Sequence, residues 1–261
     1  MLEADLQLLL QAAEKAGDLA TGFFRGKNEV WHKANHAGPV SEADLAVDQM
    51  LRESLTDARP DYGWLSEETE DSDTRQHTDR VFIVDPIDGT RSFIEGHDTW
   101  AHSLAIADKG QVIAAVVFLP ALGKLYAATP GQGATLNGEA ITVAATGRLS
   151  GSNILAARPM MEPSLWPGGV PEVKRHHRPS LAYRQCLVAE GRFDAMLTLR
   201  PSWEWDIAAG SLILAEAGAT VTDRKGAALC FNNPHPQTDG VVAAGEAVHH
   251  DLMAGLGIRT G

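Results

Sequence analysis

A short apolar run in this chain ends directly in a turn that carries two carboxylates. Val81 to Val84 contains only branched or aromatic apolar residues, and the sequence Asp-Pro-Ile-Asp-Gly-Thr follows at once as residues 85–90. Such a run, bounded by an acid and a proline, predicts a buried β-strand. The proline and glycine favour a turn at its end. The chain therefore has to fold around a buried sheet in which one strand end presents Asp85 and Asp88 together.

The two carboxylates of this turn indicate a site for a hard divalent cation. Mg²⁺ prefers oxygen ligands, and the carbonyl of Ile87 offers another one between Asp85 and Asp88. The backbone amides after Gly89, from Thr90 onward, can form a small nest that binds phosphate. Taken alone, the two acids fit equally well as turn formers that cap a loop.

Periodicity and turn signals outline the rest of the fold. Apolar residues recur at helical spacing over residues 2–24 and again between Ser41 and Pro60, which predicts two helices. Consecutive strands separated by short turns predict an antiparallel meander. After residue 180, helices and strands alternate, which is typical of an α/β unit. The predicted strands of the first part are 62–65, 81–84, 103–107, 112–118 and 124–128, and the later elements are helices 180–189 and 205–217 and strands 193–199 and 220–222.

The composition argues against several classes of function. Thirty-four acidic residues against 22 Lys and Arg give a formal net charge of -12, which repels nucleic acid and anionic lipid. Cys186 and Cys230 fit neither a disulfide framework nor a paired metal-ligand spacing, so we expect both to be reduced packing residues. The histidines show no zinc spacing and are expected at the surface. The N-terminus lacks a basic leader, and no stretch reaches the roughly 18 apolar residues of a membrane span, so we expect a cytoplasmic protein.

Four short motifs resemble those of the inositol monophosphatase superfamily. Residues 85–90, followed by Phe93, resemble its first signature, and residues 205–210 (Trp-Asp-Ile-Ala-Ala-Gly) resemble its second. Glu67-Glu68 resembles the Gly-Glu-Glu element of the family. Residues 40–44 (Val-Ser-Glu-Ala-Asp) resemble an N-terminal element that ends in aspartate. The motifs occur in the family's order, and the bacterial 3'(2'),5'-bisphosphate nucleotidase branch is the most similar one.

The resemblance implies a fold and a cofactor. The fold is a layered αβαβα sandwich of mixed α+β and α/β character, usually a homodimer. We expect residues 1–145 to form an α+β half that carries Glu67 and the 85–90 turn. Residues 146–261 would form an α/β half that carries Asp206 and the loops facing the substrate. The implied cofactor is Mg²⁺, with two or three ions per active site. The resemblance implies that one ion is bound by Glu67, Asp85 and the Ile87 carbonyl, and a second by Asp85, Asp88 and Asp206. Glu68 would lie near these ligands or bind a third ion.

The resemblance also implies a reaction, the hydrolysis of a phosphate monoester by a water molecule. Asp44 and Thr90 match the pair that polarises this water in the family, with Glu67 assisting through the metal. Gly89 and Thr90 would bind the phosphate. Water held by metal has a lowered pKa and becomes a competent nucleophile, so no covalent phosphoenzyme is required. Metal ions would also let a protein of net charge -12 bind an anionic substrate.

The substrate is less closely specified than the reaction. Arg184 and the residues around it resemble the bisphosphate nucleotidase branch, which favours 3'(2'),5'-bisphosphate nucleotides. Inositol monophosphate is the next candidate, and histidinol phosphate and fructose 1,6-bisphosphate remain open. Ser180 and Arg184 are the predicted substrate contacts, although Pro179-Ser180 replaces a glycine-containing pair and Ser66 replaces the usual glycine before Glu67. The basic cluster Lys174 to Arg178 is either a solvated loop or a site for a second phosphate.

A rival interpretation comes from another class of protein. Some relatives also act as partners of the transcription machinery, so the chain could be a non-catalytic interaction protein that keeps the fold. That interpretation predicts that some metal-ligand positions no longer hold an acidic residue. Here each ligand position holds the expected acid, which favours a small phosphorylated metabolite over a protein partner, a nucleic acid or a membrane.

Overall fold

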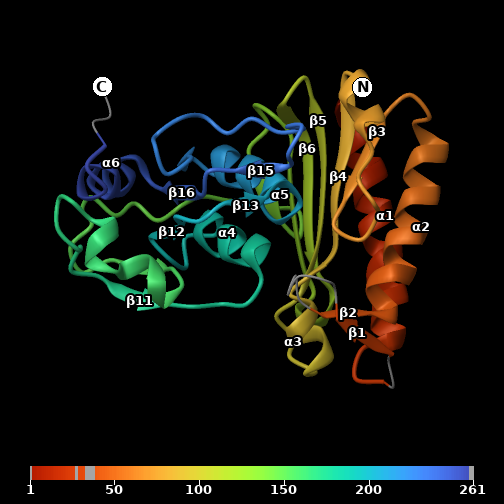
Figure 1. The fold of residues 1–261 in the computed structure, drawn as a ribbon, viewed down its shortest axis with the longest axis horizontal. Coiled ribbons are helices and arrows are strands. Elements are labelled where there is room, and N and C mark those ends of the chain that lie inside the picture. The colour runs from red at the N-terminus through yellow and green to blue at the C-terminus, as the bar shows by residue number, and fades with distance from the viewer. Residues whose placement is uncertain (1, 27–28, 33–38, 259–261) are drawn as a thin grey trace.

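The computed structural model describes residues 2–26, 29–32 and 39–258, in which layers of helix and sheet alternate across the molecule (Figure 1). Helices α1 (Leu2–Phe23) and α2 (Glu42–Ala58) cover one face of a seven-stranded sheet. Helices α4 (Leu181–Ala189) and α5 (Glu204–Glu216) lie between that sheet and a five-stranded one, and α6 (Glu246–Gly255) covers the far side. The expected αβαβα sandwich is confirmed.

The seven-stranded sheet contains the predicted meander. Its order is β3-β4-β5-β6-β7-β8-β9. β3 and β4 are parallel, and the pairs that follow are antiparallel. The strands are β3 (Gly63–Ser66), β4 (Arg80–Asp88), β5 (Ala101–Asp108), β6 (Gln111–Leu119), β7 (Lys124–Ala128), β8 (Ala134–Leu136) and β9 (Glu139–Ile141).

Strand β4 is longer than its apolar run predicts. It continues to Asp88, and its register with β5 shifts between Asp85 and Asp88. Pro86 and Ile87 together lie opposite the single residue His102. A bulge with this two-to-one arrangement bends the strand, and proline is tolerated there because it has no N–H for the ladder. The bulge therefore presents both acids at the end of the strand.

The five-stranded sheet runs in the order β11-β10-β12-β16-β14 and mixes parallel and antiparallel pairs. Its strands are β10 (Asn153–Leu155), β11 (Lys174–His176), β12 (Ala195–Thr198), β14 (Thr220–Thr222) and β16 (Val241–Ala244). Two small ribbons pair β1 (Val30–His32) with β2 (Pro39–Ser41) and β13 (Ser202–Trp203) with β15 (Gln237–Thr238). The remaining short helices are α3 (Thr90–Ile94) and the 3₁₀ helices η2 (Asp73–His77), η3 (Pro120–Leu122), η4 (Arg158–Met161) and η5 (Pro163–Leu165).

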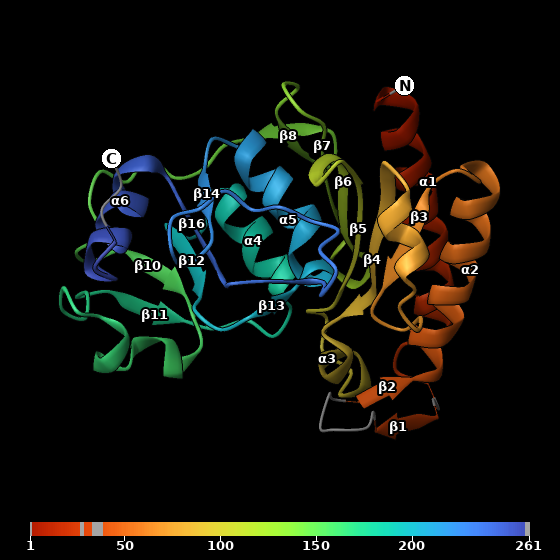
Figure 2. The same cartoon turned by 45° about the horizontal axis from the view of Figure 1, so that its top comes forward.

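Helix α5 lies at the centre of the molecule (Figure 2). Ten of its residues are buried, on all its sides, because it is enclosed between the two sheets and α4. A helix that is apolar all round is typical of such a position. The largest core cluster joins residues before and after position 145, for example Val117 and Leu212. The division at residue 145 stays a prediction.

The expectations for Cys230 and for two of the histidines are wrong. Cys186 is buried as predicted, but Cys230 is exposed. His102 and His249 are buried, not at the surface, because each finds a hydrogen-bond partner inside the protein. Lys174 begins a strand, so the basic cluster does not lie wholly in a loop. In the part of the chain that the structure describes, no helix has both the length and the apolar character to traverse a bilayer.

Candidate active site

Three acids from separate segments meet beside the end of β4. Glu67 follows β3, Asp85 lies in β4, and Asp206 lies in the first turn of α5. Oxygen atoms of the three carboxylates lie within 4.8 Å of one another. The parallel pairing of β3 and β4 carries Glu67 and Asp85 to the same side of the sheet. The close approach of acids that are far apart in sequence indicates a cation site.

The surroundings of Asp85 fit a bound metal ion. Its side chain is buried, and neither carboxylate oxygen has a hydrogen-bond partner among the described residues. Burial, followed by the charge of Glu67, raises the pKa of Asp85 well above its usual range. Burial and the charge of Asp88 raise the pKa of Asp206 in the same way. A divalent cation with oxygen ligands would relieve this repulsion and give Asp85 the partner that a buried carboxylate needs.

Asp88 is held by the start of helix α4. Its Oδ2 accepts hydrogen bonds from Oγ of Ser180 at 2.7 Å and from the amide of Ala182 at 2.6 Å. Burial nevertheless raises the pKa of Asp88 to about 6. Asp88 is not one of the three acids whose oxygens lie within 4.8 Å of one another, although its charge acts on both Asp85 and Asp206. Its role as a metal ligand, which would use Oδ1, stays a prediction.

Asp44 and Thr90 form the pair that the sequence predicted. Asp44 lies in the first turn of α2, where its Oδ2 accepts hydrogen bonds from the amide and Oγ of Ser41 at 2.9 and 2.5 Å. The hydroxyl of Thr90 lies 3.0 Å from Oδ1 of Asp44 and 3.2 Å from the carbonyl oxygen of Ile87. Burial raises the pKa of Asp44 to about 6, against the opposing effect of these hydrogen bonds. One hydroxyl thus contacts both the acid and a predicted ligand carbonyl.

Gly89 makes the turn between β4 and α3. Its φ of 101° lies in the left-handed region. A Cβ at this position would lie 3.1 Å from the carbonyl oxygen of Thr99 and 3.6 Å from Cβ of Ser180. Both the backbone conformation and the close approach therefore require glycine. Phosphate binding by the amides of Gly89 and Thr90 stays a prediction.

The serine that replaces the family's glycine has a structural partner. Oγ of Ser66 donates to Oδ1 of Asp48, and Oγ1 of Thr69 donates to Oδ2 of the same carboxylate at 2.6 Å. Oγ of Ser66 also lies 3.4 Å from the amide of Glu68. Asp48 lies one turn after Asp44 on α2, so this helix supports the Glu67-Glu68 loop as well as the predicted water-binding pair.

Ser180 and Arg184 contact the protein rather than open space. Ser180 is fully buried, and its Oγ donates to Asp88 and accepts from the amide of Tyr183. The guanidinium of Arg184 donates to the carbonyls of Arg178 and Pro179 and lies 3.0 Å from Nε2 of His177. Both side chains therefore shape the segment before α4. Their contact with substrate stays a prediction.

Comparison with known proteins identifies the family. The model of the inositol monophosphatase family matches residues 1–256. The chain belongs to the inositol monophosphatase family. It is 37% identical over 239 residues to an inositol-1-monophosphatase of Rhizobium meliloti (strain 1021), covering 85% of this chain and 86% of the relative. It is 33% identical to a histidinol-phosphatase of Chlorobaculum parvum (97% and 96% covered) and 30% identical to the 3'(2'),5'-bisphosphate nucleotidase CysQ of Escherichia coli (87% and 93% covered).

A solved structure agrees with the family assignment. The extragenic suppressor protein SuhB from Bartonella henselae superimposes with a TM-score of 0.81 at 30% sequence identity, covering 97% of this chain and 98% of that one. Members of the inositol monophosphatase family are metal-dependent phosphatases. The chain is therefore a hydrolase of phosphate monoesters, and its three clustered carboxylates are a group that can hold a metal ion.

Sequence reasoning missed His102, which supports the 85–90 turn. Its Nδ1 pairs with the carbonyl of Pro86, inside the bulge of β4. Burial lowers the pKa of His102 to about 4, so the ring is neutral at physiological pH and Nδ1 can carry the donated proton. The signal available in the sequence was a histidine within a mostly apolar strand, but the register shift that places it opposite Pro86 cannot be read from periodicity.

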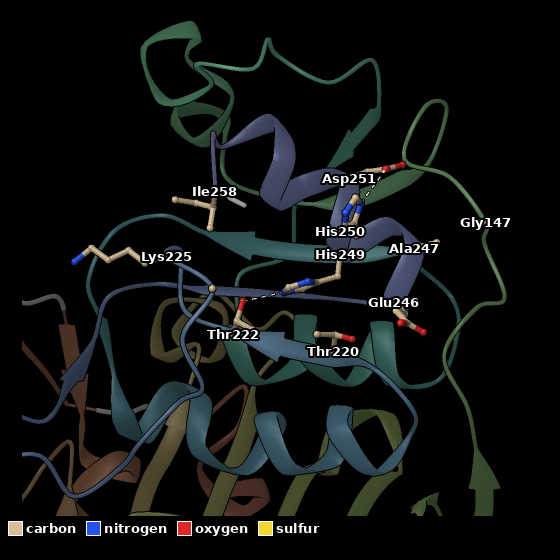
Figure 3. A pocket seen from close by; sticks show the side chains of 11 residues that line it. Gly147, Thr220, Thr222, Lys225, Glu246, Ala247, His249, His250, Asp251 and Ile258 are labelled. Atoms are coloured by element: carbon tan, nitrogen blue, oxygen red, sulfur yellow. Dashed lines mark hydrogen bonds and ion pairs between the residues drawn. The ribbon is translucent and has the colours of Figure 1, made fainter. Parts of the chain in front are cut away.

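A concave region lies beside α6 and β14, away from the acidic cluster. A pocket of about 790 Å³ is lined by α6 and β14 residues, including Thr222 and His249, whose side chains are joined at 2.8 Å (Figure 3). None of the predicted site residues lines it.

Proposed function

We propose that this phosphatase uses Mg²⁺ to hydrolyse small metabolites that carry a second phosphate, with 3'(2'),5'-bisphosphate nucleotides as the preferred class. The observation that carries the proposal is the cluster of Glu67, Asp85 and Asp206, in which the buried Asp85 carboxylate has no hydrogen-bond partner among the described residues. Mg²⁺ is the cation that best suits a site built from carboxylate and carbonyl oxygens next to a phosphate.

The metal would be held by the three clustered acids, with Asp88 and the carbonyl of Ile87 as further ligands. When bound, divalent cations supply positive charge that offsets the phosphate dianion and acidifies a water molecule. Without them, the acids of this site would repel the substrate. The proposal therefore assigns the acids to binding and orienting, not to nucleophilic attack on phosphorus.

Asp44 and Thr90 would hold the attacking water and accept its proton. With a pKa of about 6, Asp44 is largely ionised at neutral pH but close enough to neutrality to act as a general base. The Thr90 hydroxyl, 3.0 Å from the carboxylate, orients the water and can relay the proton to Oδ1 of Asp44. The amides after Gly89 would receive the phosphate oxygens.

The preference for a second phosphate rests on the cations before α4. Nη2 of Arg184 lies 3.0 Å from Nε2 of His177, and the charges of Arg175 and Arg178 also act on that imidazole. This basic group adjoins the metal centre, because Ser180 at the start of α4 is bonded to Asp88. A second phosphate would find counter-charge there. Inositol monophosphate, which lacks one, is the alternative that the 37% identical relative favours.

A substrate panel tests both parts of the proposal. Phosphate release is measured with Mg²⁺ and with EDTA for adenosine 3',5'-bisphosphate, adenosine 3'-monophosphate, inositol 1-phosphate, histidinol phosphate and fructose 1,6-bisphosphate. We expect EDTA to abolish activity, and kcat/KM to be about tenfold or more higher for the bisphosphate than for the 3'-monophosphate, the effect of one charged contact. Equal kcat/KM for the two adenosine nucleotides would reject the bisphosphate preference.

A variant pair makes this test specific to the basic group. Arg178→Gln should lower kcat/KM for the bisphosphate more than for the monophosphate, whereas Arg158→Gln, at an exposed position of η4, should change neither. Activity that is absent for all five substrates would favour the non-catalytic interaction protein. We also propose a homodimer, which sedimentation equilibrium would test.

A further inference from the structure

A buried chain of polar contacts joins the two segments that bring distant acids to the metal centre. One segment is the loop after β3, which carries Glu67 and Glu68 and leads into η2. The other is the start of α5, which carries Asp206. Arg75 of η2 and Glu204 of α5, with exposed fractions of 1% and 0%, are the charged ends of this chain. Asn232 and Asn233 lie between them.

Arg75 anchors the loop that carries the glutamates. Its Nε and Nη2 bind the two oxygens of Asp71 at 2.6 and 2.8 Å, a bidentate pair that fixes the orientation of the guanidinium. Its backbone packs directly on β3, because a Cβ on Gly63 would lie 3.0 Å from Cα of Arg75. Arg75 thus contacts both β3, where the Glu67 loop starts, and Asp71, near the end of that loop.

The same guanidinium reaches the segment around Asn232. Nη1 of Arg75 donates to Oδ1 of Asn232 at 2.6 Å, and Nδ2 of Asn232 returns a hydrogen bond to the carbonyl of Arg75 at 3.2 Å. Nη2 also donates to the carbonyl of Asn233 at 3.0 Å. Asn232 has a φ of 60°, a conformation that non-glycine residues adopt rarely and that these contacts hold in place.

Glu204 completes the connection to α5. Its Oε2 accepts the amide of Asn232 at 2.6 Å, and its Oε1 accepts the amide and the side-chain Nδ2 of Asn233 at 2.9 and 2.7 Å. Glu204 is the first residue of α5, and Asp206 follows two positions later. The orientation of this helix start therefore depends on a contact that ends at Arg75.

We propose that Arg75, Asn232 and Glu204 form a positioning bridge that holds the Glu67 loop and the Asp206 helix start at the spacing a divalent cation requires. The inference rests on the proposed metal centre. The acids of that centre repel one another. Without contacts that hold the two segments together, cation binding would also have to overcome this repulsion, and the affinity for the cation would be lower. None of the three bridge residues belongs to the proposed set of metal ligands.

The test compares Mg²⁺ affinity in the full-length protein. Arg75→Lys keeps the charge but loses the bidentate fork. Asn232→Gly removes a neutral side chain at a position whose φ of 60° glycine adopts without strain. Arg59→Lys is the matched control, because Arg59 pairs at 2.9 Å with the fully buried Asp5 but does not lie between the two segments. The readouts are the Mg²⁺ concentration for half-maximal thermal stabilisation and for half-maximal phosphate release.

We expect both bridge variants to need about tenfold more Mg²⁺ in both readouts, the typical effect of losing a residue that supports metal ligands. At saturating Mg²⁺, kcat and KM should return to within about twofold of wild type. The Mg²⁺ requirement of the double variant should also rise by no more than about tenfold, because both substitutions interrupt the same connection between the two segments. Arg59→Lys should melt earlier but keep the wild-type Mg²⁺ requirement.

Two different failures can be told apart. Bridge variants that melt earlier but keep the wild-type Mg²⁺ requirement would reject the bridge and leave the proposed function standing. A wild-type protein that responds to Mg²⁺ in neither readout would reject the proposed function, and the bridge with it.

Discussion

The hydroxyl of Thr90 lies 3.0 Å from Oδ1 of Asp44, although the two residues are 46 positions apart in the chain. Asp44 lies in the first turn of α2 on the outer face of the large sheet, and Thr90 begins α3 at the end of β4. The bulge and Gly89 aim α3 at the start of α2. This contact places the proposed general base beside the acidic cluster, and it can be tested directly.

Removing either partner of this pair should slow catalysis without weakening metal binding. We expect Asp44→Asn and Thr90→Ala each to lower kcat by about 10²-fold or more, the usual loss for a general base or its partner. The Mg²⁺ requirement should stay the same, because neither side chain is a proposed ligand. Asp57→Asn, at an exposed position of the same helix, is the control and should behave as wild type. Steady-state kinetics across a Mg²⁺ titration measure both quantities.

Mg²⁺ should stabilise the folded protein through Asp85. A ligand present at 100 times its Kd stabilises by about 2.7 kcal/mol, which raises the Tm of a protein of this size by about 5 °C or more. Asp85→Asn should abolish this shift, because the buried carboxylate is the centre of the cluster. Differential scanning calorimetry with EDTA or Mg²⁺ measures it. A shift that survives in the variant would place the ion elsewhere.

The Mg²⁺-dependent stabilisation should grow with pH between about 5 and 8. Burial raises the pKa of Asp88 to about 6 and that of Asp85 well above its usual range. The unfolded carboxyls titrate near 3.9. The folded protein without metal therefore binds protons more tightly than the unfolded chain. The stability that Asp88 contributes is fully present below pH of about 4 and is lost as the pH rises through about 6, and the contribution of Asp85 is likewise lost as the pH rises through its raised pKa.

Metal and protons compete for these carboxylates, so Mg²⁺ should restore more stability at pH 8 than at pH 5. Melting temperatures with EDTA and with Mg²⁺ at both pH values measure the difference. Asp85→Asn serves as the reference, since it lacks one of the titrating groups. A Mg²⁺ effect that is equal at the two pH values, or larger at pH 5, would contradict the assignment of these acids.

Ser66 should stabilise the fold through Asp48. Ser66→Gly restores the glycine that the family usually has, but it leaves the buried Asp48 carboxylate without one of its two donors. We expect a loss of about 1.5–3 kcal/mol, the range for a hydrogen bond to a charged group. Urea denaturation measures it. Ser54→Ala is the control, because the hydroxyl of Ser54 bonds only within its own helix, and a loss as small as in that control would refute the role of Ser66.

Much of the fold follows from the sequence, because its strongest elements are local. The helical spacing of α1 and the apolar runs of β4 to β7 each specify their own element, and the meander turns lie where glycine and proline place them. Strands such as β1, β10, β15 and β16 were missed. They are only two to four residues long, which is too short to show the alternating pattern of a strand, and they pair with strands that the local sequence does not identify.

The candidate site divides in the same way. Motifs of acids and glycine identify Glu67, Asp85 and Asp206, and the structure brings these three together. The internal partners of Ser180 and Arg184 and the Arg75 contacts to Asn232 could not be predicted. These contacts depend on how the tertiary fold places the 230–233 segment and the start of α4 near the large sheet. The spacing of these residues in the sequence does not predict that placement.

Anomalous scattering from a crystal soaked in Mn²⁺ would test the central claim most directly, since Mn²⁺ accepts the same oxygen ligands as Mg²⁺. We predict an anomalous peak between the carboxylates of Glu67, Asp85 and Asp206. Full occupancy at another position, with these three side chains left without a metal, would contradict the account.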